Sequence, residues 1–399
     1  MTNEVKNVPQ LRFPNFDGEW EEKQLGDVTK TNQGLQIAIS DRKTKYEKGL
    51  YFYITNEFLR PNSQTKYYIE NPPESVVAEK SDILMTRTGN TGKVITNVEG
   101  AFHNNFFKIK YNKSIIDRLF LFELLKSPKI NNKFLSLAGT STIPDLNHSD
   151  FYSVYISFPT ISEQQKISTF FSKLDQQIEL EEQKLEKLEE QKKGYMQQIF
   201  SRQFLFENEK GDTDYSWRNF KINDIFSKIE SGNRLPKTNL VEGNIPYVIA
   251  QTTNNGVFMH ISEDTLDYHK NKLKLFKKGS ITISIDNPEA MFIQEMDFFT
   301  SNVMRVIHNE NLKRGSHIFI MESLKKLTQS YNWSVKFSGP IIMDSTVKFP
   351  VYNDNKVNWN VVNKIGDFFN TFEIRINRQS DKIKLLEERK KGFLQKMFV

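Results

Sequence analysis

The chain of 399 residues contains no cysteine. This absence excludes disulfide frameworks, thiolate zinc sites and thiol nucleophiles, and it favours a reducing compartment. The sequence also lacks any apolar run near the roughly 18 residues that a membrane-spanning helix needs. Its first residues, MTNEVKNVPQ, are polar and carry no apolar segment of the kind that a signal peptide has. We therefore expect a cytoplasmic protein that does not enter a membrane.

Recognisable catalytic and metal-binding motifs are missing as well. The 6 histidines form no i, i+4 pair, so no metal site is predicted. NPPE at 71–74 lacks the aromatic fourth residue of an adenine-methylating motif, and GNTG at 89–92 lacks the Gly-Lys-Ser/Thr of a phosphate-binding loop. No G-x-S-x-G elbow is present, and the carboxylates match no nuclease or hydrolase pattern. These absences favour a chain that binds over one that catalyses.

The chain has enough apolar material to build folded cores. Its 32 Phe and 14 Tyr, with a hydrophobic content of 38% and a charged content of 26%, describe a globular protein and not a disordered one. A length of 399 residues suits two domains with connecting elements. The formal charge of +6 favours a polyanionic partner without proving one, since many basic proteins bind nothing acidic.

The strongest positive signal is an internal repeat. Residues 170–201 align without a gap on residues 368–399, at an offset of 198 residues. Identical pairs include Phe170/Phe368, Phe171/Phe369, Ile178/Ile376, Leu188/Leu386, Lys192/Lys390, Gly194/Gly392 and Phe200/Phe398. Earlier landmarks keep the same order, among them Trp20/Trp217 and Gly34/Gly232. Because the offset is half of the chain, we interpret the protein as two tandem copies of one plan.

Each copy ends in a segment with the pattern of a long helix. Pro159 is expected to end the preceding strand, and Ser162 with Gln165 fits a capping box at the start of the first helix. Apolar residues then recur at spacings of three and four, which is typical of a coiled coil. The predicted helix–helix seam comprises Leu174, Ile178, Leu185, Leu188 and Ile199 in the first copy, and Phe372, Ile376, Ile383, Leu386 and Met397 in the second.

Both seams are interrupted at equivalent positions. The interruptions are Glu181 and Lys192 in the first helix and Gln379 and Lys390 in the second. Their match favours packing of the two helices on each other, antiparallel because both lie on one chain, over solvated helices or helices packed on their own domains. A helix from about 163 to 200 would span roughly 57 Å and would place the two bodies at opposite ends of a rod.

The body of each copy has the patterns of a mixed α/β domain. SITISI at 280–285 has the period of a half-buried strand, and DILMT at 82–86 and FFKIK at 106–110 also predict strands. Short helices are expected at 115–126 and 317–329. The predicted fold is two tandem mixed α+β domains with two long antiparallel coiled-coil helices and a pseudo-twofold internal repeat. The predicted segments are a first body at 1–160, a central helix at 161–203, a second body at 204–357 and a C-terminal helix at 358–399.

Several loops are rich in Arg, Lys, Asn, Gln, Ser and Thr, whose donors pair with base edges and phosphates. A solvated turn explains any one of these residues equally well, so the prediction concerns the sets. The candidate DNA-binding residues of the first copy are Arg42, Lys43, Lys45, Arg87, Thr88, Asn90, Lys93, Asn104, Asn105 and Thr142. Those of the second copy are Arg234, Lys237, Gln251, Thr252, Thr253, Asn254, Asn255, Asp286, Asn287, Ser301 and Asn302.

Taken in order, these features resemble the specificity subunits of type I restriction–modification systems. The resemblance is carried by the two helices and by LRFPNFDGEWEEKQLGDV (11–28), SDILMTRTGNTGKV (81–94), GTSTIPDLNHSDF (139–151) and FPTISEQQKI (158–167). The second copy departs from this pattern because it lacks a clear counterpart of STIPDL and of P-x-x-x-E-Q. It is similar to another subtype of recognition domain through IPYVIAQTTNNGVFMHI (245–261), YNWSVKFSG (331–339) and VKFPVYNDNKVNW (347–359).

The resemblance implies that each body is a target-recognition domain for one half of a bipartite, asymmetric site in double-stranded DNA. It implies that the helices set the spacer and dock two methyltransferase subunits, which endonuclease/translocase subunits would join. S-adenosylmethionine, ATP and magnesium are then expected on those partners, and no cofactor on this chain. The chain would be non-catalytic yet required for both methylation and restriction. From the residues alone, an enzyme with a degenerate site and a coiled-coil scaffold that reads no sequence remain alternatives.

Overall fold

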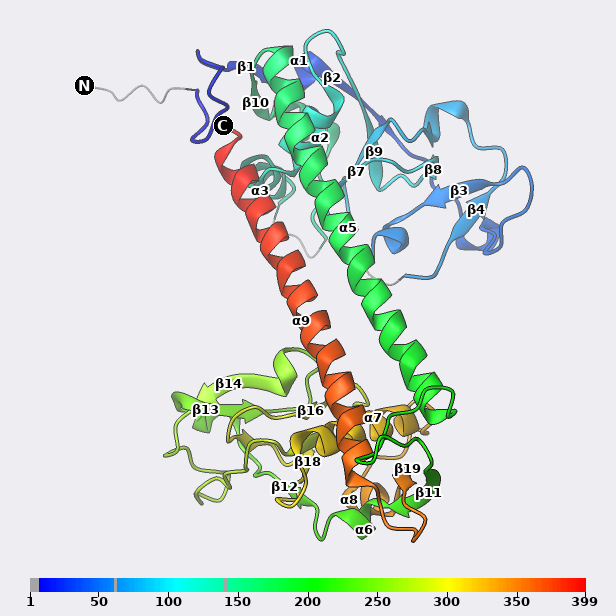
Figure 1. Ribbon diagram of the computed structural model, residues 1–399. Coiled ribbons are helices and arrows are strands. Elements are labelled where there is room, and N and C mark those ends of the chain that lie inside the picture. The colour runs from blue at the N-terminus through cyan, green and yellow to red at the C-terminus, as the bar shows by residue number, and fades with distance from the viewer. Residues whose placement is uncertain (1–6, 61–62, 140–142) are drawn as a thin grey trace. The chain divides into compact units, whose positions relative to one another are not determined.

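The computed structural model describes residues 7–60, 63–139 and 143–399 (Figure 1). The chain divides into two compact units. Unit 1 consists of Met1–Gln183 together with Ser380–Val399, and unit 2 consists of Lys184–Gln379.

Both divisions fall inside a long helix. Helix α5 covers Ile161–Phe200 and helix α9 covers Trp359–Lys396, as the sequence predicts. Each of these helices therefore contributes one part to each unit. Helix α5 begins at Ile161, so Ser162 lies inside its first turn and the predicted capping box does not form the helix start. Strand β10 (Tyr155–Phe158) ends immediately before Pro159, as expected.

Unit 1 is a mixed α+β body built from short strands and helices. Its sheets have the strand orders β1-β10, β2-β9-β6-β7 and β4-β3-β8-β5. The strands before β10 are β1 (Glu21–Gln24), β2 (Thr29–Gln33), β3 (Tyr51–Ile54), β4 (Tyr67–Ile69), β5 (Val77–Ala78), β6 (Ile83–Thr86), β7 (Val94–Ile95), β8 (Gly100–Phe102) and β9 (Phe106–Tyr111). The helices before α5 are α1 (Leu25–Val28), α2 (Arg118–Lys126), α3 (Pro128–Leu137) and α4 (His148–Ser153).

Unit 2 repeats this plan. Its sheets have the strand orders β11-β19, β12-β18-β15-β16 and β14-β13-β17. The strands are β11 (Ser216–Lys221), β12 (Glu230–Ser231), β13 (Glu242–Val248), β14 (Val257–Ile261), β15 (Ile281–Ser284), β16 (Met291–Ile293), β17 (Phe299–Thr300), β18 (Met304–Ile307) and β19 (Thr346–Val351). The helices before α9 are α6 (Ile222–Ile225), α7 (Arg314–Thr328) and α8 (Gly339–Asp344).

The two units share one topology, which confirms the internal repeat and the mixed α+β class. The antiparallel pair β6–β9 corresponds to β15–β18, and the parallel pair β3–β8 corresponds to β13–β17. Strand β5, which pairs with β8, corresponds to a single bridge between Phe276 and Phe298 in unit 2. The repeated glycines have a shared structural reason. A Cβ at Gly34 would collide with the carbonyl of Phe102, and one at Gly232 with the carbonyl of Thr300.

Strand β15 differs from its prediction in one respect. The alternation in SITISI predicts one polar and one apolar face, but Thr282 and Ser284 are as fully buried as Ile281 and Ile283. The polar face is tolerated because its groups are bonded. The Thr282 hydroxyl donates to the carbonyl of Phe292 (3.2 Å) and accepts from the amide of Gln294 (2.9 Å). Both faces of this strand are therefore covered.

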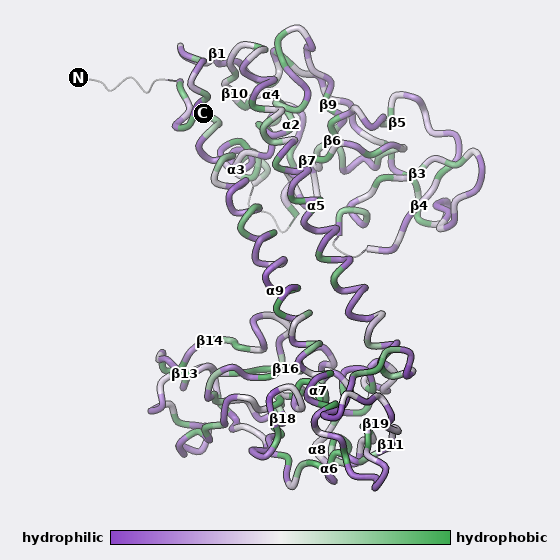
Figure 2. The backbone as a smooth tube through the Cα atoms, in the orientation of Figure 1, coloured by the Kyte–Doolittle hydropathy of each residue, from purple (hydrophilic) through white to green (hydrophobic). Residues whose placement is uncertain are grey.

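The two long helices pack antiparallel within each unit. In unit 1, successive contacts join Phe170 to Phe393, Asp175 to Lys390 and Glu181 to Lys382. Residue numbers therefore increase along α5 while they decrease along α9, as expected for antiparallel helices. In unit 2, Tyr195 contacts Phe368 in the same sense. All ten predicted seam residues are buried or half-buried in the structure. Figure 2 shows isolated hydrophobic positions along otherwise hydrophilic helices.

The ends of the helices complete the cores of the units. The core of unit 1 includes Trp20, Phe120 and Phe171 together with Met397 and Phe398, which directly follow α9. The core of unit 2 includes Ile199 from the end of α5, packed with residues of α7, β19 and the start of α9. Burying such large apolar side chains is the main favourable term in each unit.

Candidate nucleic-acid interface

The candidate loops of unit 1 follow strands whose ends lie together. Backbone bonds connect them: the N–H of Arg87, after β6, donates to the carbonyl of Asn105 (2.7 Å). The N–H of Asn104 donates to the carbonyl of Leu35 (3.1 Å), and that of His103 to the carbonyl of Ile54 (2.9 Å). We call this set of bonds the strand-end frame. It brings Arg87, Asn104 and Asn105 to one edge of the unit.

Arg87 is held by a carboxylate from a distant part of the chain. Its Nε donates to Asp145 Oδ1 (3.0 Å) and its terminal nitrogen to Asp145 Oδ2 (2.5 Å), a bidentate pair. Backbone bonds hold the same two segments together: the N–H of Leu146 donates to the carbonyl of Arg87 (2.9 Å), and Thr88 forms a β-bridge with Asp145. The guanidinium also lies 5.9 Å from the ring centroid of Phe107. Arg87 is thus bound to Asp145 and Leu146.

The loop after Arg87 is a tight turn with its polar side chains at the surface. Asn90 is exposed and adopts a φ of 64°, a left-handed conformation that Asn tolerates. The hydroxyl of Thr86 donates to its carbonyl (2.5 Å). Lys93 is exposed along its stem, and its Nζ donates to the carbonyl of Leu59 (3.2 Å). Asn56, which sequence analysis missed, donates to the carbonyl of Thr88 (2.9 Å).

The basic cluster Arg42, Lys43 and Lys45 is less uniform than the sequence suggests. Arg42 is half-buried and turned inward: its Nε and terminal nitrogen donate to the carbonyl of Ile37 (3.1 and 2.8 Å), and it lies against the rings of Tyr53 and Tyr67. Lys43 pairs with Glu70 at the surface (2.7 Å). Lys45 is exposed. Arg42 is therefore engaged within the fold, whereas the two lysines face solvent.

Two glutamines join the asparagines at the strand-end frame of unit 1. Gln33 donates to the carbonyl of Asn104 (3.2 Å), and Asn104 donates to the side chain of Gln36 (3.2 Å). Sequence analysis missed both glutamines, although they flank the landmark Gly34. Burial and the nearby Arg42 lower the pKa of His103, whose neutral ring accepts from the N–H of Asn105 (3.1 Å). Thr142 lies outside the described residues.

Unit 2 reproduces the strand-end frame with different side chains. The N–H of Asn233 donates to the carbonyl of Thr300 (3.1 Å), as the N–H of Leu35 does to the carbonyl of Phe102 in unit 1 (3.1 Å). The N–H of Ser301 donates to the carbonyl of Val248 (3.1 Å). The N–H of Ile285 donates to the carbonyl of Val303 (3.2 Å). These bonds bring three predicted residues, Asp286, Ser301 and Asn302, to one edge. Asn302 and Asp286 are exposed, whereas Ser301 is buried.

Unit 2 has a structural counterpart of the contact between Leu146 and Arg87, although its sequence has no clear counterpart of STIPDL. The N–H of Phe337 donates to the carbonyl of Ile285 (2.8 Å), just as Leu146 does to Arg87 in unit 1. Lys336 then lies 3.5 Å from Asp286, where unit 1 has Asp145 beside Arg87. Lys336 and Phe337 therefore stand where Asp145 and Leu146 stand in unit 1. Asp145 pairs with Arg87, whereas Lys336 pairs with Asp286, the residue after Ile285, which is the equivalent of Arg87.

The loop QTTNN divides into an inner and an outer part. Gln251 is half-buried, and its amide donates to the carbonyl of Val257 (2.8 Å). Asn254 and Asn255 are exposed, with φ of 51° and 50°. Thr252 and Thr253 are also exposed. Four of the five residues thus present donors and acceptors to solvent.

The remaining predicted residues of unit 2 lie near the same frame. Arg234 is exposed and lies 4.8 Å from the ring centroid of Tyr268, whose N–H donates to the Arg234 carbonyl (2.9 Å). Lys237 is exposed. Asn287 is half-buried at a turn, where its side chain accepts from the N–H of Glu289 (3.0 Å).

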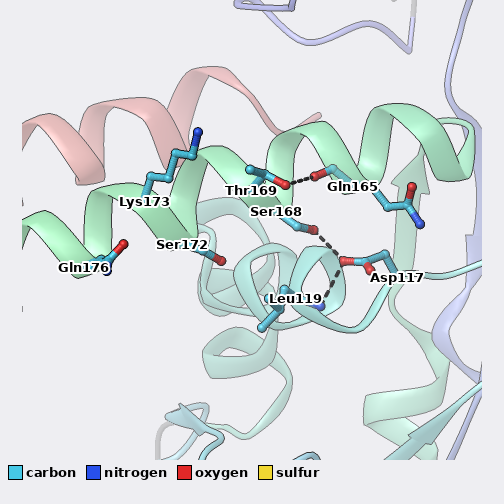
Figure 3. Close-up of a pocket in the computed structure, with 8 residues that line it drawn as sticks. All are labelled: Asp117, Leu119, Gln165, Ser168, Thr169, Ser172, Lys173 and Gln176. Atoms are coloured by element: carbon cyan, nitrogen blue, oxygen red, sulfur yellow. Dashed lines mark hydrogen bonds between the residues drawn. The ribbon is translucent and has the colours of Figure 1, made fainter.

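One cavity of unit 1 contains a serine beside a carboxylate. A polar hollow of about 290 Å³ lies between α2 and α5 of unit 1 (Figure 3). Its carboxylate, Asp117, accepts from the hydroxyl of Ser168 (2.5 Å) and caps α2 through the N–H of Leu119 (3.0 Å). No histidine lines this hollow, so Ser168 has no base beside it there. Within residues 7–60, 63–139 and 143–399, no cluster of three or more His, Cys, Asp or Glu could hold a metal ion.

A family model described as the type I restriction modification DNA specificity domain matches residues 17–190 and, a second time, residues 215–383. The chain belongs to this family. It carries two specificity domains in tandem, as its resemblance to type I specificity subunits implies. Of the helices in the described part of the chain, none is long and apolar enough to cross a membrane.

Named relatives agree with this assignment. The MjaVIII specificity subunit of Methanocaldococcus jannaschii is 25% identical over 294 residues, covering 71% of this chain and 67% of that protein. The MjaIX specificity subunit of the same organism is 27% identical over 277 residues, covering 64% and 63%. The specificity subunit of the type II enzyme BcgI from Heyndrickxia coagulans is 28% identical over 144 residues, covering 35% and 40%.

Solved structures show the same fold at low sequence identity. The S subunit of a type I restriction–modification system from M. genitalium matches with a TM-score of 0.60 and 16% identity, covering 98% of this chain and 99% of that one. A chain from a study of complex assembly and conformational transition in the type I R-M system matches with a TM-score of 0.52 and 14% identity, covering 94% and 96%.

Proposed function

We propose that this type I specificity subunit reads a bipartite, asymmetric DNA site, one half with each unit. The observation that carries the proposal is the strand-end frame, which is the same in both units and presents different polar side chains in each. Unit 1 presents Asn104, Asn90 and Lys93, and unit 2 presents the loop at 252–255 with Asn302. Side chains of these types hydrogen-bond to base edges and phosphates. A shared backbone frame that carries different polar side chains in each unit suits the recognition of two different half-sites.

The long helices support a spacer between the half-sites. A helix of this length spans roughly 57 Å, and successive major-groove faces of DNA are separated by roughly 34–36 Å. The pairing of α5 with α9 would set the unread spacer by fixing the distance between the readers. The helices would also dock two methyltransferase subunits, and endonuclease/translocase subunits would join that core.

Methylation and cleavage of the DNA are assigned to those partner subunits. Methyl transfer to a flipped adenine needs S-adenosylmethionine, and translocation with cleavage needs ATP and magnesium. The specificity subunit would contribute recognition to both reactions and would be non-catalytic itself. This division of labour is supported by the match of the chain to the DNA specificity domain of type I systems.

A map of methylated adenines tests the proposal. The chain is expressed with its methyltransferase partner in a host that lacks other adenine methylation, and modified bases are located by long-read sequencing. We expect one two-part motif with a fixed, unspecified spacer. A soluble complex that methylates nothing would instead support a scaffold without sequence recognition. Methylation by the isolated chain would support an enzyme.

A further inference from the structure

Two lysines occupy equivalent interruptions of the helix seams. Lys192 on α5 and Lys390 on α9 are related by the internal repeat, and their side chains are 14% and 13% exposed. A buried ammonium group is costly unless it is paired, because charge is poorly solvated away from water. Each lysine is paired, and the arrangement of its partners is the same in both units.

In unit 2, Lys192 joins three helices. Its ammonium bonds to the carboxylate of Glu373 on α9 and lies 3.1 Å from that of Glu322 on α7. Glu322 is almost completely buried, with 2% of its side chain exposed, and it also lies 3.7 Å from Lys325. Burial opposes the charge on Lys192, but Glu322 and Glu373 outweigh it and raise the lysine pKa. Lys192 therefore keeps its charge at neutral pH.

In unit 1, Lys390 makes the equivalent junction. Its ammonium lies 2.5 Å from Asp175 on α5 and 3.6 Å from Glu123 on α2. Glu123, with 4% of its side chain exposed, also lies 3.3 Å from Lys126. Burial opposes the charge on Lys390, and Glu123 with Asp175 raises its pKa. Each junction thus has the same three groups. Lys390 corresponds to Lys192, Asp175 on the partner long helix corresponds to Glu373, and Glu123 on the helix of the body corresponds to Glu322.

Both lysines lie on the far part of a helix that begins in the other unit. Helix α5 begins in unit 1 and carries Lys192 into unit 2, whereas α9 begins in unit 2 and carries Lys390 into unit 1. The carboxylates at each junction belong to the helix that begins in that unit and to the body of that unit. Each lysine is therefore the charged group through which an incoming helix meets its host unit.

An apolar seam by itself leaves the register of two helices open. A pattern with spacings of three and four repeats every seven residues, so a slip by one heptad, roughly 10 Å, still brings apolar residues together. The same slip would carry each lysine away from both of its carboxylates. Asp175 and Glu373 would lose this lysine, and Glu123 and Glu322 would keep only Lys126 and Lys325. Buried ion pairs contribute little net stability, but they penalise arrangements in which they are broken. Their value here is selection of one register.

We infer that Lys192 and Lys390 are positioning residues that fix the register of the incoming helix in each unit. Resting on the proposed function, this inference further assigns them control of spacer length in the DNA site. The bases read in each half-site depend on other residues and would not change with the lysines.

The first test compares buried and exposed lysines at adjacent positions. Lys192→Met and Lys390→Met remove the junction charges, while Lys193→Met and Lys391→Met change exposed neighbours on the same helices. In the methyltransferase complex, we expect the junction variants to methylate sites whose spacer differs from that of the wild type, with a rise of about tenfold over wild type at such sites. The half-site bases stay the same, and the control variants keep one spacer. A single wild-type spacer in a folded junction variant overturns the assignment.

The second test needs no DNA. Because the chain has no Cys, Glu179→Cys on α5 and Lys384→Cys on α9 provide unique spin-label sites within unit 1. Pulsed electron resonance on the full chain should give one narrow distance in the wild-type and Lys391→Met backgrounds. The Lys390→Met background should add a second distance, shifted on the scale of the roughly 10 Å heptad slip. One unchanged narrow distance contradicts the register role.

If Lys390→Met alone does not fold, a variant in which apolar residues replace the ion pair can still show whether the lysine fixes the register. The double variant Lys390→Met and Asp175→Leu removes the Lys390–Asp175 ion pair and leaves Glu123 paired with Lys126. Replacing a whole ion pair by apolar residues is often neutral or stabilising. We expect this variant to fold and to show mixed distances; a single wild-type distance overturns the inference. If the distances respond as expected but the wild-type complex yields no bipartite methylation, the proposed function fails and the register role stands.

Discussion

A pair of histidines in unit 2 shows how burial sets the charge of a single side chain. The rings of His308 and His317 stack with centroids 5.3 Å apart. His317 Nε2 accepts from the N–H of Asn309 (3.2 Å), which requires an unprotonated nitrogen. Burial lowers the pKa of His317 to about 4, with His308 adding to the effect and the carbonyl of Lys313 opposing it. At neutral pH the ring is uncharged.

This gives a pH dependence with a defined sign. Between pH 6.5 and about 4, the unfolded chain binds a proton at His317 that the folded chain does not. The contribution of His317 to stability is therefore complete above pH 6.5 and is lost as the pH falls. We expect the unfolding free energy of the wild type to drop by about 1 kcal/mol per pH unit more than that of His317→Gln. Denaturant unfolding between pH 6.5 and 5 measures the difference, and parallel curves would refute it.

The Arg87–Asp145 pair bears on recognition at the same scale. Asp145→Asn keeps the shape of the side chain and removes the charge that holds the guanidinium. We expect tighter binding to non-specific DNA, with the salt dependence of log K steeper by about one phosphate contact. Changes in methylated sequence should be confined to the half-site of unit 1, and Asp286→Asn should act only on the other half-site. An unchanged salt slope and an unchanged motif would count against a role for this pair.

The direction in which a side chain points was the hardest property to predict from the sequence. Arg42 and Lys43 are adjacent and both basic, yet Arg42 is turned in toward Tyr53 while Lys43 faces solvent. The choice depends on the carbonyl of Ile37 and on Glu70, whose positions only the fold determines. Asp145 and Lys336 were missed as partners of the strand-end frame for the same reason, because each comes from a segment far along the chain.

At the scale of elements, two glycines decide how closely helices α7 and α9 approach. In unit 2, a Cβ on Gly366 would collide with the carbonyl of Gly315, and a Cβ on Gly315 would collide with the carbonyl of Asn363. Helix backbones in contact at this point leave no room for a methyl group on either glycine. By contrast, a Cβ on Gly392, near the end of α9, would have no atom within 4 Å.

These surroundings predict opposite effects for the same substitution. Gly366→Ala should destabilise unit 2 by about 1–3 kcal/mol, because the helices must move apart. Gly392→Ala should be neutral or stabilising by up to about 1 kcal/mol, because Ala is the better helix former. Thermal or denaturant unfolding of the two variants in parallel provides the measurement. Equal shifts for both variants would show that helix propensity and not the close approach dominates.

Elements with a regular pattern were predicted well. The long helices and the strands β6, β9 and β15 lie where the periodicity places them, because a period of 3.6 or 2 survives whatever the partners are. The helices α2 and α7 were expected, but they begin at Arg118 and Arg314. The burial of both faces of β15 was not predictable, since the alternation of Ile with Thr and Ser does not reveal that Gln294 satisfies the hydroxyl of Thr282.

At the scale of the whole molecule, the repeat predicts modular recognition. Replacing residues 204–357 with the second body of another specificity subunit should change one half-site and preserve the other, because each unit carries its own strand-end frame. Sequencing of methylated DNA from the hybrid complex provides the readout. Simultaneous change in both half-sites would show that the units do not read independently.

The division of the chain predicts an uneven response to truncation. Removing residues 380–399 takes Leu394, Met397 and Phe398 out of the core of unit 1. Losses of this kind cost about 2–5 kcal/mol for each large side chain, which approaches the whole stability of a domain. We expect hydrogen exchange to be fast throughout unit 1 and to remain slow in strands β15 and β18 of unit 2. Protection retained in β6 and β9 would contradict the expectation.

The same arrangement has a consequence for the order in which the protein matures on the ribosome. Residues of unit 1 emerge first, yet its core lacks Met397 and Phe398 until those two residues have been translated. Unit 2, whose residues run continuously from Lys184 to Gln379, has all its parts earlier. Unit 1 therefore begins synthesis before unit 2 but completes its core after it. During synthesis the apolar surface around Trp20 and Phe171 must avoid other partners until Leu394, Met397 and Phe398 have been made.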